Sequence, residues 1–261
     1  MQTFTSQQLT LKSENLSGLL LAITILSLWV ISLVGLLWAP LSTVSLGWII
    51  LAVLGRTFLQ TGLFVIAHDA MHVNLSPYNK RLNDIMGTVA VSLYACLPYQ
   101  QCCINHRKHH QHPAQIGDPD FHDGIHDHPV LWYLTFLKSY LSVRSISLLL
   151  LKGCLLFWGL SQLFQMSVTH LMLFWGLPLI LSSIQLFFFG TYLPHRQEFA
   201  PSNTAHPMQS SQLLVLWSLL SCYHFGFYHW EHHQYPKTPW YRLPTTSVSK
   251  NLLAMQRHKK K

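Results

Sequence analysis

The segment His106-Arg-Lys-His-His-Gln-His112 concentrates histidines at helical spacing. His106, His109 and His110 stand at positions i, i+3 and i+4, and side chains at these positions leave an α-helix from one face. The imidazole nitrogen is a common metal ligand in proteins. The segment therefore predicts a helix that presents three histidines to a metal ion.

Two further segments, or boxes, repeat this pattern. His68-Asp-Ala-Met-His72 places two histidines at i and i+4, and His229-Trp-Glu-His-His233 repeats the i, i+3, i+4 spacing. One such box also occurs on solvated helix faces, but three boxes with related spacings favour convergence on a metal site. The candidate ligands from the three boxes are His68, His72, His106, His109, His110, His229, His232 and His233.

These eight imidazoles exceed the four ligands that one tetrahedral zinc ion needs, so they predict two metal ions. Nitrogen ligands suit Fe, Cu, Zn or Ni, and ligand type alone does not select among them. The first box reads HDAMH and lacks the glutamate of an HExxH zinc protease. Neither GxGxxG nor GxxxxGK[ST] occurs in the sequence, so electrons for a redox reaction are expected to come from an outside donor.

The composition is that of an integral membrane protein. Of the 261 residues, 50% are hydrophobic and only 10% are charged, and the apolar residues come in blocks as long as a bilayer crossing. The formal charge of +8 is not arranged as a basic stripe with interleaved aromatics, so it favours anionic lipid and not nucleic acid as the partner. The five cysteines form no CxxC pair and predict no disulfide framework.

The apolar blocks predict an all-α membrane fold with about four transmembrane helices, joined by interfacial or re-entrant helices that carry the histidines on one face. We expect a single domain over residues 1–261, with a polar N-terminus at 1–15 and a basic tail at 245–261. The four expected spans are Leu16–Trp38, Val44–Ala67, Ile146–Phe164 and Val168–Gly190.

Three other apolar segments are not expected to cross. A crossing by Leu82–Ile104 would place the first two boxes on opposite sides of the membrane, so we predict a hairpin or in-plane segment there, with Gly87 and Pro98 as breakers. Leu131–Val143 is aromatic and lightly basic, which suits an interfacial helix. Gln212–Phe227 is short and is expected to lie partly buried among the other helices.

Four crossings bring all three boxes to one side of the membrane. Fifteen of the seventeen Lys and Arg residues lie in segments on that side, and the positive-inside rule makes it cytoplasmic. Arg56 lies near the middle of the second span, where a charge is costly, and no acidic residue lies within a span. Its expected partners are Gln60, backbone carbonyls or a polar cavity.

The boxes resemble those of the membrane-bound di-iron desaturase and hydroxylase superfamily. Three further segments resemble the bacterial-type β-carotene ketolases within it, and the resemblance extends over roughly residues 45–245. These segments are Asp118-Pro-Asp-Phe-His122, Gly190-Thr-Tyr-Leu-Pro-His-Arg196 and Cys222-Tyr-His-Phe-Gly226.

The resemblance implies that the eight box histidines bind two iron ions. It also implies a ninth lone ligand, for which His195 is the best match and His224 the competitor. Asp69 and Asp118 are the catalytic candidates, and they would act with Asp120 by fixing imidazole tautomers. For Asp118 and Asp120 a role as helix cap or turn former is nearly as well supported, because Pro119 stands between them.

The implied reaction is oxidation of the C4 and C4′ methylenes of β-carotene to ketones, through echinenone to canthaxanthin, with O2 as co-substrate and a soluble redox protein such as ferredoxin as electron donor. The alternatives are a carotenoid or fatty-acyl hydroxylase or desaturase with the same boxes and, from another class, a divalent-metal transporter. The aromatics Trp132, Tyr133, Phe187, Phe188 and Phe189 either line a polyene channel or belong to the aromatic belt of the membrane interface.

Overall fold

The computed structural model describes residues 2–125, 127–164, 167–196 and 212–246, and these residues form helices and loops without a strand. This confirms the expected all-α class. The chain divides into two compact units, one of Met1–Ile104 with Leu137–Ile184 and one of Asn105–Phe136 with Gln185–Lys261. The expectation of a single domain over 1–261 stays a prediction.

The apolar helices agree with the predicted number of crossings. Leu16–Leu37 of α1 (Gln2–Leu37), α2 (Leu46–Met71) and the helical run Val168–His195 are long and apolar enough to span a bilayer. The predicted span Ile146–Phe164 meets this test only when α6 (Val143–Phe164) is joined to α5 (Pro129–Tyr140) as one broken span. The described residues thus hold three to four candidate spans.

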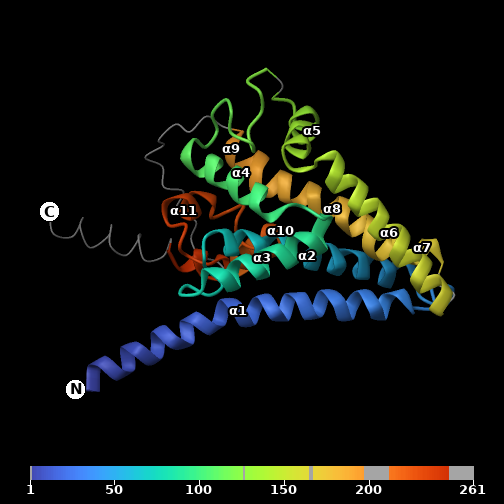
Figure 1. The fold of residues 1–261 in the computed structure, drawn as a ribbon, viewed down its shortest axis with the longest axis horizontal. Coiled ribbons are helices and arrows are strands. Elements are labelled where there is room, and N and C mark those ends of the chain that lie inside the picture. The colour runs from blue at the N-terminus through green and yellow to red at the C-terminus, as the bar shows by residue number, and fades with distance from the viewer. Residues whose placement is uncertain (1, 126, 165–166, 197–211, 247–261) are drawn as a thin grey trace. The chain divides into compact units, whose positions relative to one another are not determined.

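In the first unit, α1 lies along α2, and α2 packs against α3 (Lys80–Ala95) (Figure 1). The buried Gln60 side chain of α2 joins these three helices. Its Oε1 accepts a hydrogen bond from Trp29 Nε1 at 2.7 Å, and its Nε2 donates to the Tyr94 carbonyl at 3.0 Å. The outward faces of α1 and α2 expose large side chains such as Ile31 and Leu51, which suits contact with lipid acyl chains.

Arg56 is buried in the same helix packing, with 1% of its surface exposed. Its guanidinium donates to the carbonyls of Trp29 at 2.6 Å and Phe174 at 3.0 Å and to the Ser32 hydroxyl at 2.9 Å, and it lies over the Trp29 ring. The predicted use of backbone carbonyls is confirmed. The predicted use of Gln60 is wrong, because that amide is engaged by Trp29 and Tyr94 instead.

The segment predicted to turn back, Leu82–Ile104, is broken into two helices. α3 ends at Cys96, whose φ of 54° is left-handed, and α4 (Tyr99–Gln111) begins after Pro98. Neither helix is long enough to cross a bilayer alone, as expected. The assignment of Gly87 as a breaker is wrong: it lies inside α3, and a side chain there would overlap the Tyr99 ring.

The last span contains two π-helical segments. α7 (Val168–Leu171) leads into η1 (Met172–Gly176), α8 (Leu177–Gln185) leads into η2 (Leu186–Tyr192), and α9 (Leu193–His195) ends the run. Pro194 has no N–H to donate to the preceding turn, which favours an irregular hydrogen-bond pattern at this place. π-Helical turns are frequent at functional sites, and η2 leads directly to His195.

A tight turn separates α10 (Gln212–Cys222) from α11 (His229–Gln234). Tyr223 and His224 adopt positive φ values of 46° and 72° in it. Gly226 lies so close to η2 that a Cβ there would be 2.8 Å from the Phe189 carbonyl oxygen. This close approach brings the start of α11 next to the segment that carries His195. The η3 turn (Trp240–Arg242) follows α11 in the chain.

Candidate metal centre

Seven candidate ligands lie in the second unit, and they come from three places in the chain. α4 carries the histidines of the second box, α11 carries those of the third, and α9 ends at His195. The helical spacing of both boxes is therefore confirmed. The seven residues are His106, His109, His110, His195, His229, His232 and His233.

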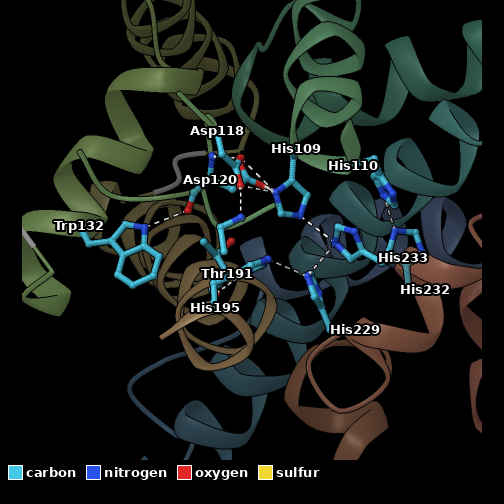
Figure 2. Close-up of polar contacts among 11 residues, drawn as sticks. His109, His110, Asp118, Asp120, Trp132, Thr191, His195, His229, His232 and His233 are labelled. Carbon is cyan, nitrogen blue, oxygen red and sulfur yellow. Dashed lines mark hydrogen bonds and ion pairs between the residues drawn. The ribbon is translucent and has the colours of Figure 1, made fainter. Parts of the chain in front are cut away.

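Four of these residues form one group. The ligand nitrogens of His109, His195, His229 and His233 all lie within 4.8 Å of one another. Figure 2 shows the four rings linked in a bent chain that turns back on itself. The Nε2 atoms are 3.0 Å apart between His109 and His233, 3.0 Å between His233 and His229, and 3.1 Å between His229 and His195. Three separate segments of the chain thus converge on a volume the size of one ion.

The Nδ1 atoms show which nitrogen carries the proton in two of these rings. His109 Nδ1 lies 2.9 and 3.1 Å from the two carboxylate oxygens of Asp118, and His195 Nδ1 lies 2.7 Å from the Thr191 carbonyl oxygen. A carbonyl oxygen and an ionised carboxylate only accept hydrogen bonds, so each Nδ1 is the donor. In the neutral rings both Nε2 atoms are then the acceptors, and an Nε2 lone pair is what imidazole offers to a metal ion. This donor set fits a metal ion.

A second group in the same unit consists of His106, His110 and His232, whose ligand nitrogens also lie within 4.8 Å of one another. His110 Nε2 is 2.9 Å from His232 Nε2, and the rings of His106 and His110 are 4.5 Å apart. Two nitrogen-only groups in one unit agree with the two metal ions expected from the number of histidines.

The first box lies at the end of α2 in the other unit. His68 is in the helix, His72 caps it, and their ring centroids are 5.1 Å apart, so the i, i+4 pairing is confirmed. Asp69 is buried, and its Oδ1 is 3.9 Å from His68 Nδ1.

The electrostatics of the second unit distinguish the rings. Burial lowers the pKa of His109, but the charge of Asp120 and the hydrogen bond and charge of Asp118 outweigh burial and raise it overall. Burial and the charge of His109 lower the pKa of His110 to about 4. The pKa of Asp118 falls in spite of burial, because His109 and the backbone N–H groups of Asp120 and Ala114 stabilise the carboxylate. Burial and the neighbouring histidines lower the pKa of His229 strongly. His110 and His229 therefore stay neutral, as ligands must.

The two readings of Asp118 both describe the structure. Its Oδ1 accepts from the Asp120 backbone N–H at 2.9 Å and its Oδ2 from the Ala114 backbone N–H at 3.0 Å, so it forms the turn as well as holding His109. His224 lies outside both histidine groups found among the described residues, and its Nδ1 is 2.6 Å from the Ser218 hydroxyl. Sequence reasoning missed the Thr191 carbonyl, because a backbone acceptor leaves no mark in the residue type.

Helices of span length and two groups of convergent imidazoles are the features of a histidine-rich membrane protein with candidate metal sites. Residues 42–258 match the fatty acid desaturase family. A beta-carotene ketolase of a Paracoccus species is 42% identical over 193 residues, which are 74% of this chain and 76% of that protein. A beta-carotene ketolase of Haematococcus lacustris is 38% identical over 194 residues, 72% of this chain and 58% of that protein. A zeaxanthin 4-ketolase of Chlamydomonas reinhardtii is 35% identical over 254 residues, 88% of this chain and 53% of that protein.

The chain belongs to the fatty acid desaturase family and, within it, to the ketolases that act on carotenoids. It spans about three quarters of the Paracoccus relative and little more than half of the two algal ones. No solved structure matches the chain.

Proposed function

We propose that the chain is a β-carotene 4-ketolase, which converts the C4 and C4′ methylenes of the β-ionone rings to ketones. The observation that carries this proposal is the 42% identity to a beta-carotene ketolase over three quarters of both chains. The nitrogen-only groups of the second unit support an oxidation that needs a metal. The apolar helices suit a substrate dissolved in the membrane.

We assign two iron ions to the histidines. His109, His195, His229 and His233 would hold one ion, and His106, His110 and His232 would hold the other together with His68 and His72 of the first box. His195 is our choice for the ninth ligand, because its Nε2 faces His229 while His224 Nδ1 is engaged by Ser218. The irons, when bound, supply the activation of O2 that hydroxylation of the allylic ring C–H bonds requires.

The chain's own residues set the geometry of this chemistry. Asp118 keeps the Nδ1 proton on His109, and the Thr191 carbonyl keeps it on His195, so that both Nε2 atoms face inward. At each ring carbon a C–H bond is replaced by C–OH twice, and the resulting geminal diol loses water to give the ketone. Each hydroxylation takes one oxygen atom of O2 into the product and reduces the other to water with two electrons and two protons. A soluble redox protein would supply the electrons at the cytoplasmic face, where the basic segments are expected.

The test is the carotenoid profile of a bacterium that accumulates β-carotene and expresses this chain. Echinenone and canthaxanthin are the expected products, and the cells should redden. Unchanged β-carotene in cells with inserted, iron-loaded protein would reject the substrate. A hydroxylated product without ketone would instead indicate a carotenoid hydroxylase, and an altered fatty-acyl profile would indicate a desaturase.

Hydroxylated rings are a second candidate substrate, favoured by the similarity to a zeaxanthin 4-ketolase. Feeding zeaxanthin in the same host should give ketones beside the existing hydroxyl groups if the site accepts them. A divalent-metal transporter would show metal flux and reversible zinc binding in place of ketocarotenoids.

A further inference from the structure

Trp132 of α5 is among the most deeply buried side chains of the second unit, with 1% of its surface exposed. A buried indole carries one N–H group that needs an acceptor. Trp132 Nε1 donates to the Asp120 carbonyl oxygen at 2.9 Å (Figure 2). The proposed function has so far given this residue no part.

The acceptor of this bond belongs to the loop that holds a candidate ligand. The Asp120 backbone N–H donates to Asp118 Oδ1 at 2.9 Å, and the Asp118 carboxylate accepts from His109 Nδ1. Trp132 therefore fixes one end of a short chain of hydrogen bonds whose other end is the His109 ring. The described residues between α4 and α5, 112–125 and 127–128, form no helix, so this bond ties the loop to a regular element.

The faces and edges of the same indole contact a second ligand-bearing segment. The Trp132 ring lies 5.4 Å from the Tyr192 ring and 6.1 Å from the Phe187 ring, both in edge-on geometry. Tyr192 and Phe187 belong to η2, which runs directly into His195. Such aromatic pairs each contribute about 0.5–1.5 kcal/mol beyond burial. The rings of His109 and His195 are in turn 4.9 Å apart.

We infer that Trp132 is a positioning residue for the four-histidine group, fixing His109 through its N–H and His195 through its ring. The inference rests on the proposed function, because it needs that group to hold a metal ion. It also makes the effect of Trp132 selective. Metal affinity of the four-histidine group depends on this side chain, and metal affinity of the second group (His106, His110 and His232) depends on it less. Loss of a partner that orients a ligand typically costs about 10–100-fold in metal affinity.

Three variants separate the two contacts. Trp132→Phe keeps an aromatic ring and loses the N–H, Trp132→Leu loses both, and replacement by benzothienylalanine changes only N–H to sulfur in an isosteric ring. The control is Trp217→Phe on α10 of the same unit, where the indole is 55% exposed. The purified, metal-depleted proteins are titrated with Co2+ in detergent, and bound metal per chain is measured together with the Co2+ absorption spectrum.

The wild type and Trp217→Phe are expected to bind two Co2+ ions. Trp132→Phe and the benzothienyl variant should bind one of them about tenfold more weakly, and Trp132→Leu should bind that one more weakly still. Thermal unfolding of the metal-depleted proteins checks that each variant is folded, and the isosteric variant decides the matter if Trp132→Phe is not. If the folded variants bind both ions as tightly as the wild type does, the inference is overturned. It is also overturned if the affinities for both ions fall by the same factor. A wild type that fails to bind two ions would instead overturn the proposed metal centre.

Discussion

The two units bury nitrogen in opposite ways. In the first unit the Arg56 guanidinium lies among helices of the expected membrane region, and the Trp29 carbonyl, the Phe174 carbonyl and the Ser32 hydroxyl accept its hydrogen bonds. In the second unit the Nε2 atoms of His109, His233, His229 and His195 face one another at 3.0–3.1 Å. The chain itself supplies acceptors for Nε and Nη1 of Arg56, whereas the four imidazoles direct their Nε2 atoms at one another.

This difference separates a structural polar group from a functional one. Buried polar groups are normally hydrogen-bonded within the protein, and Arg56 follows that rule through its Nε and Nη1 atoms at the junction of α1, α2 and η1, whereas its Nη2 has no hydrogen-bond partner among the described residues. In the four-histidine group, His109 and His195 are held in the tautomer whose Nε2 lone pair faces His233 and His229 respectively, which is the form that binds a metal ion. Arg56 and the four histidines are both unusual as buried polar groups. They differ in that backbone carbonyls and a hydroxyl accept from Arg56, whereas the acceptor nitrogens of His109 and His195 point at other imidazoles.

The largest expected effect is the difference in activity between a variant of the four-histidine group and a variant of Arg56. His109→Ala should abolish ketocarotenoid formation, since loss of a ligand costs more than the about 10–100-fold caused by loss of an outer partner. Arg56→Met should keep both metal ions and measurable conversion while lowering the free energy of unfolding by about 1–3 kcal/mol, because it leaves carbonyls without their donor. The measurements are product analysis, metal content and unfolding in detergent. If Arg56→Met is folded and yet loses metal, Arg56 is not a purely structural group.

A smaller effect is expected from the carboxylate that orients His109. Asp118→Asn keeps the size of the side chain but removes its charge, so the amide no longer favours a single tautomer of His109. We expect affinity for one of two metal ions to fall about 10–100-fold. Asp123→Asn in the same loop is the matched control, because Asp123 is exposed and its Oδ1 accepts from the nearby Ile125 N–H. Equal metal affinity in Asp118→Asn and Asp123→Asn would remove Asp118 from the site.

The sequence predicted those parts of the site that follow a local rule. His106 and His110 of the second box, and His229 and His233 of the third, share helix faces because α4 and α11 form where the spacing indicated. His195 has no such partner in sequence, and it entered only through the resemblance to known ketolases. The Thr191 carbonyl was not predictable, because it depends on the backbone path of η2 and not on a residue type.

The same distinction applies to the fold. The break at Pro98 follows from the chemistry of proline and was predicted, whereas Gly87 was wrongly assigned as a breaker. Its small size leaves room for the Tyr99 ring of the next helix, and this contact cannot be predicted from the residues next to Gly87 in sequence. Arg56 was recognised as costly, but its partners Trp29 and Phe174 lie far away in sequence. Contacts between separate helices thus mark the limit of prediction in the first unit.

Gly226 offers a steric test of how the third box is placed against His195. A Cβ at Gly226 would lie 2.8 Å from the Phe189 carbonyl oxygen, so Gly226→Ala must move the turn or η2, at a typical cost of about 1–3 kcal/mol. The control is Gly190→Ala, where the nearest atom to a Cβ is Cys222 Sγ at 3.7 Å. We expect Gly226→Ala to lower the affinity for one metal ion and to lower conversion of β-carotene. Gly190→Ala should change neither quantity. Equal behaviour of the two variants in a metal titration would refute this placement.

The smallest expected effect is a change in pH dependence at His224, a buried histidine outside the two metal groups. Burial lowers its pKa to about 4. The folded state therefore keeps this ring neutral while the unfolded chain takes up a proton near its ordinary pKa of about 6.5. Stability is full above pH 6.5 and falls as the pH decreases from 6.5 toward 4.

His224→Asn should flatten this part of the stability curve. Asparagine tolerates the φ of 72° at this position, and its amide can reach the Ser218 hydroxyl that now contacts His224 Nδ1. Thermal unfolding of the metal-depleted protein at pH 7 and pH 5 measures the effect without interference from metal release. The variant should lose less stability than the wild type between these two values, since it has no ring to protonate on unfolding. Parallel losses would mean that His224 titrates alike in both states, and that burial at this turn does not resist protonation.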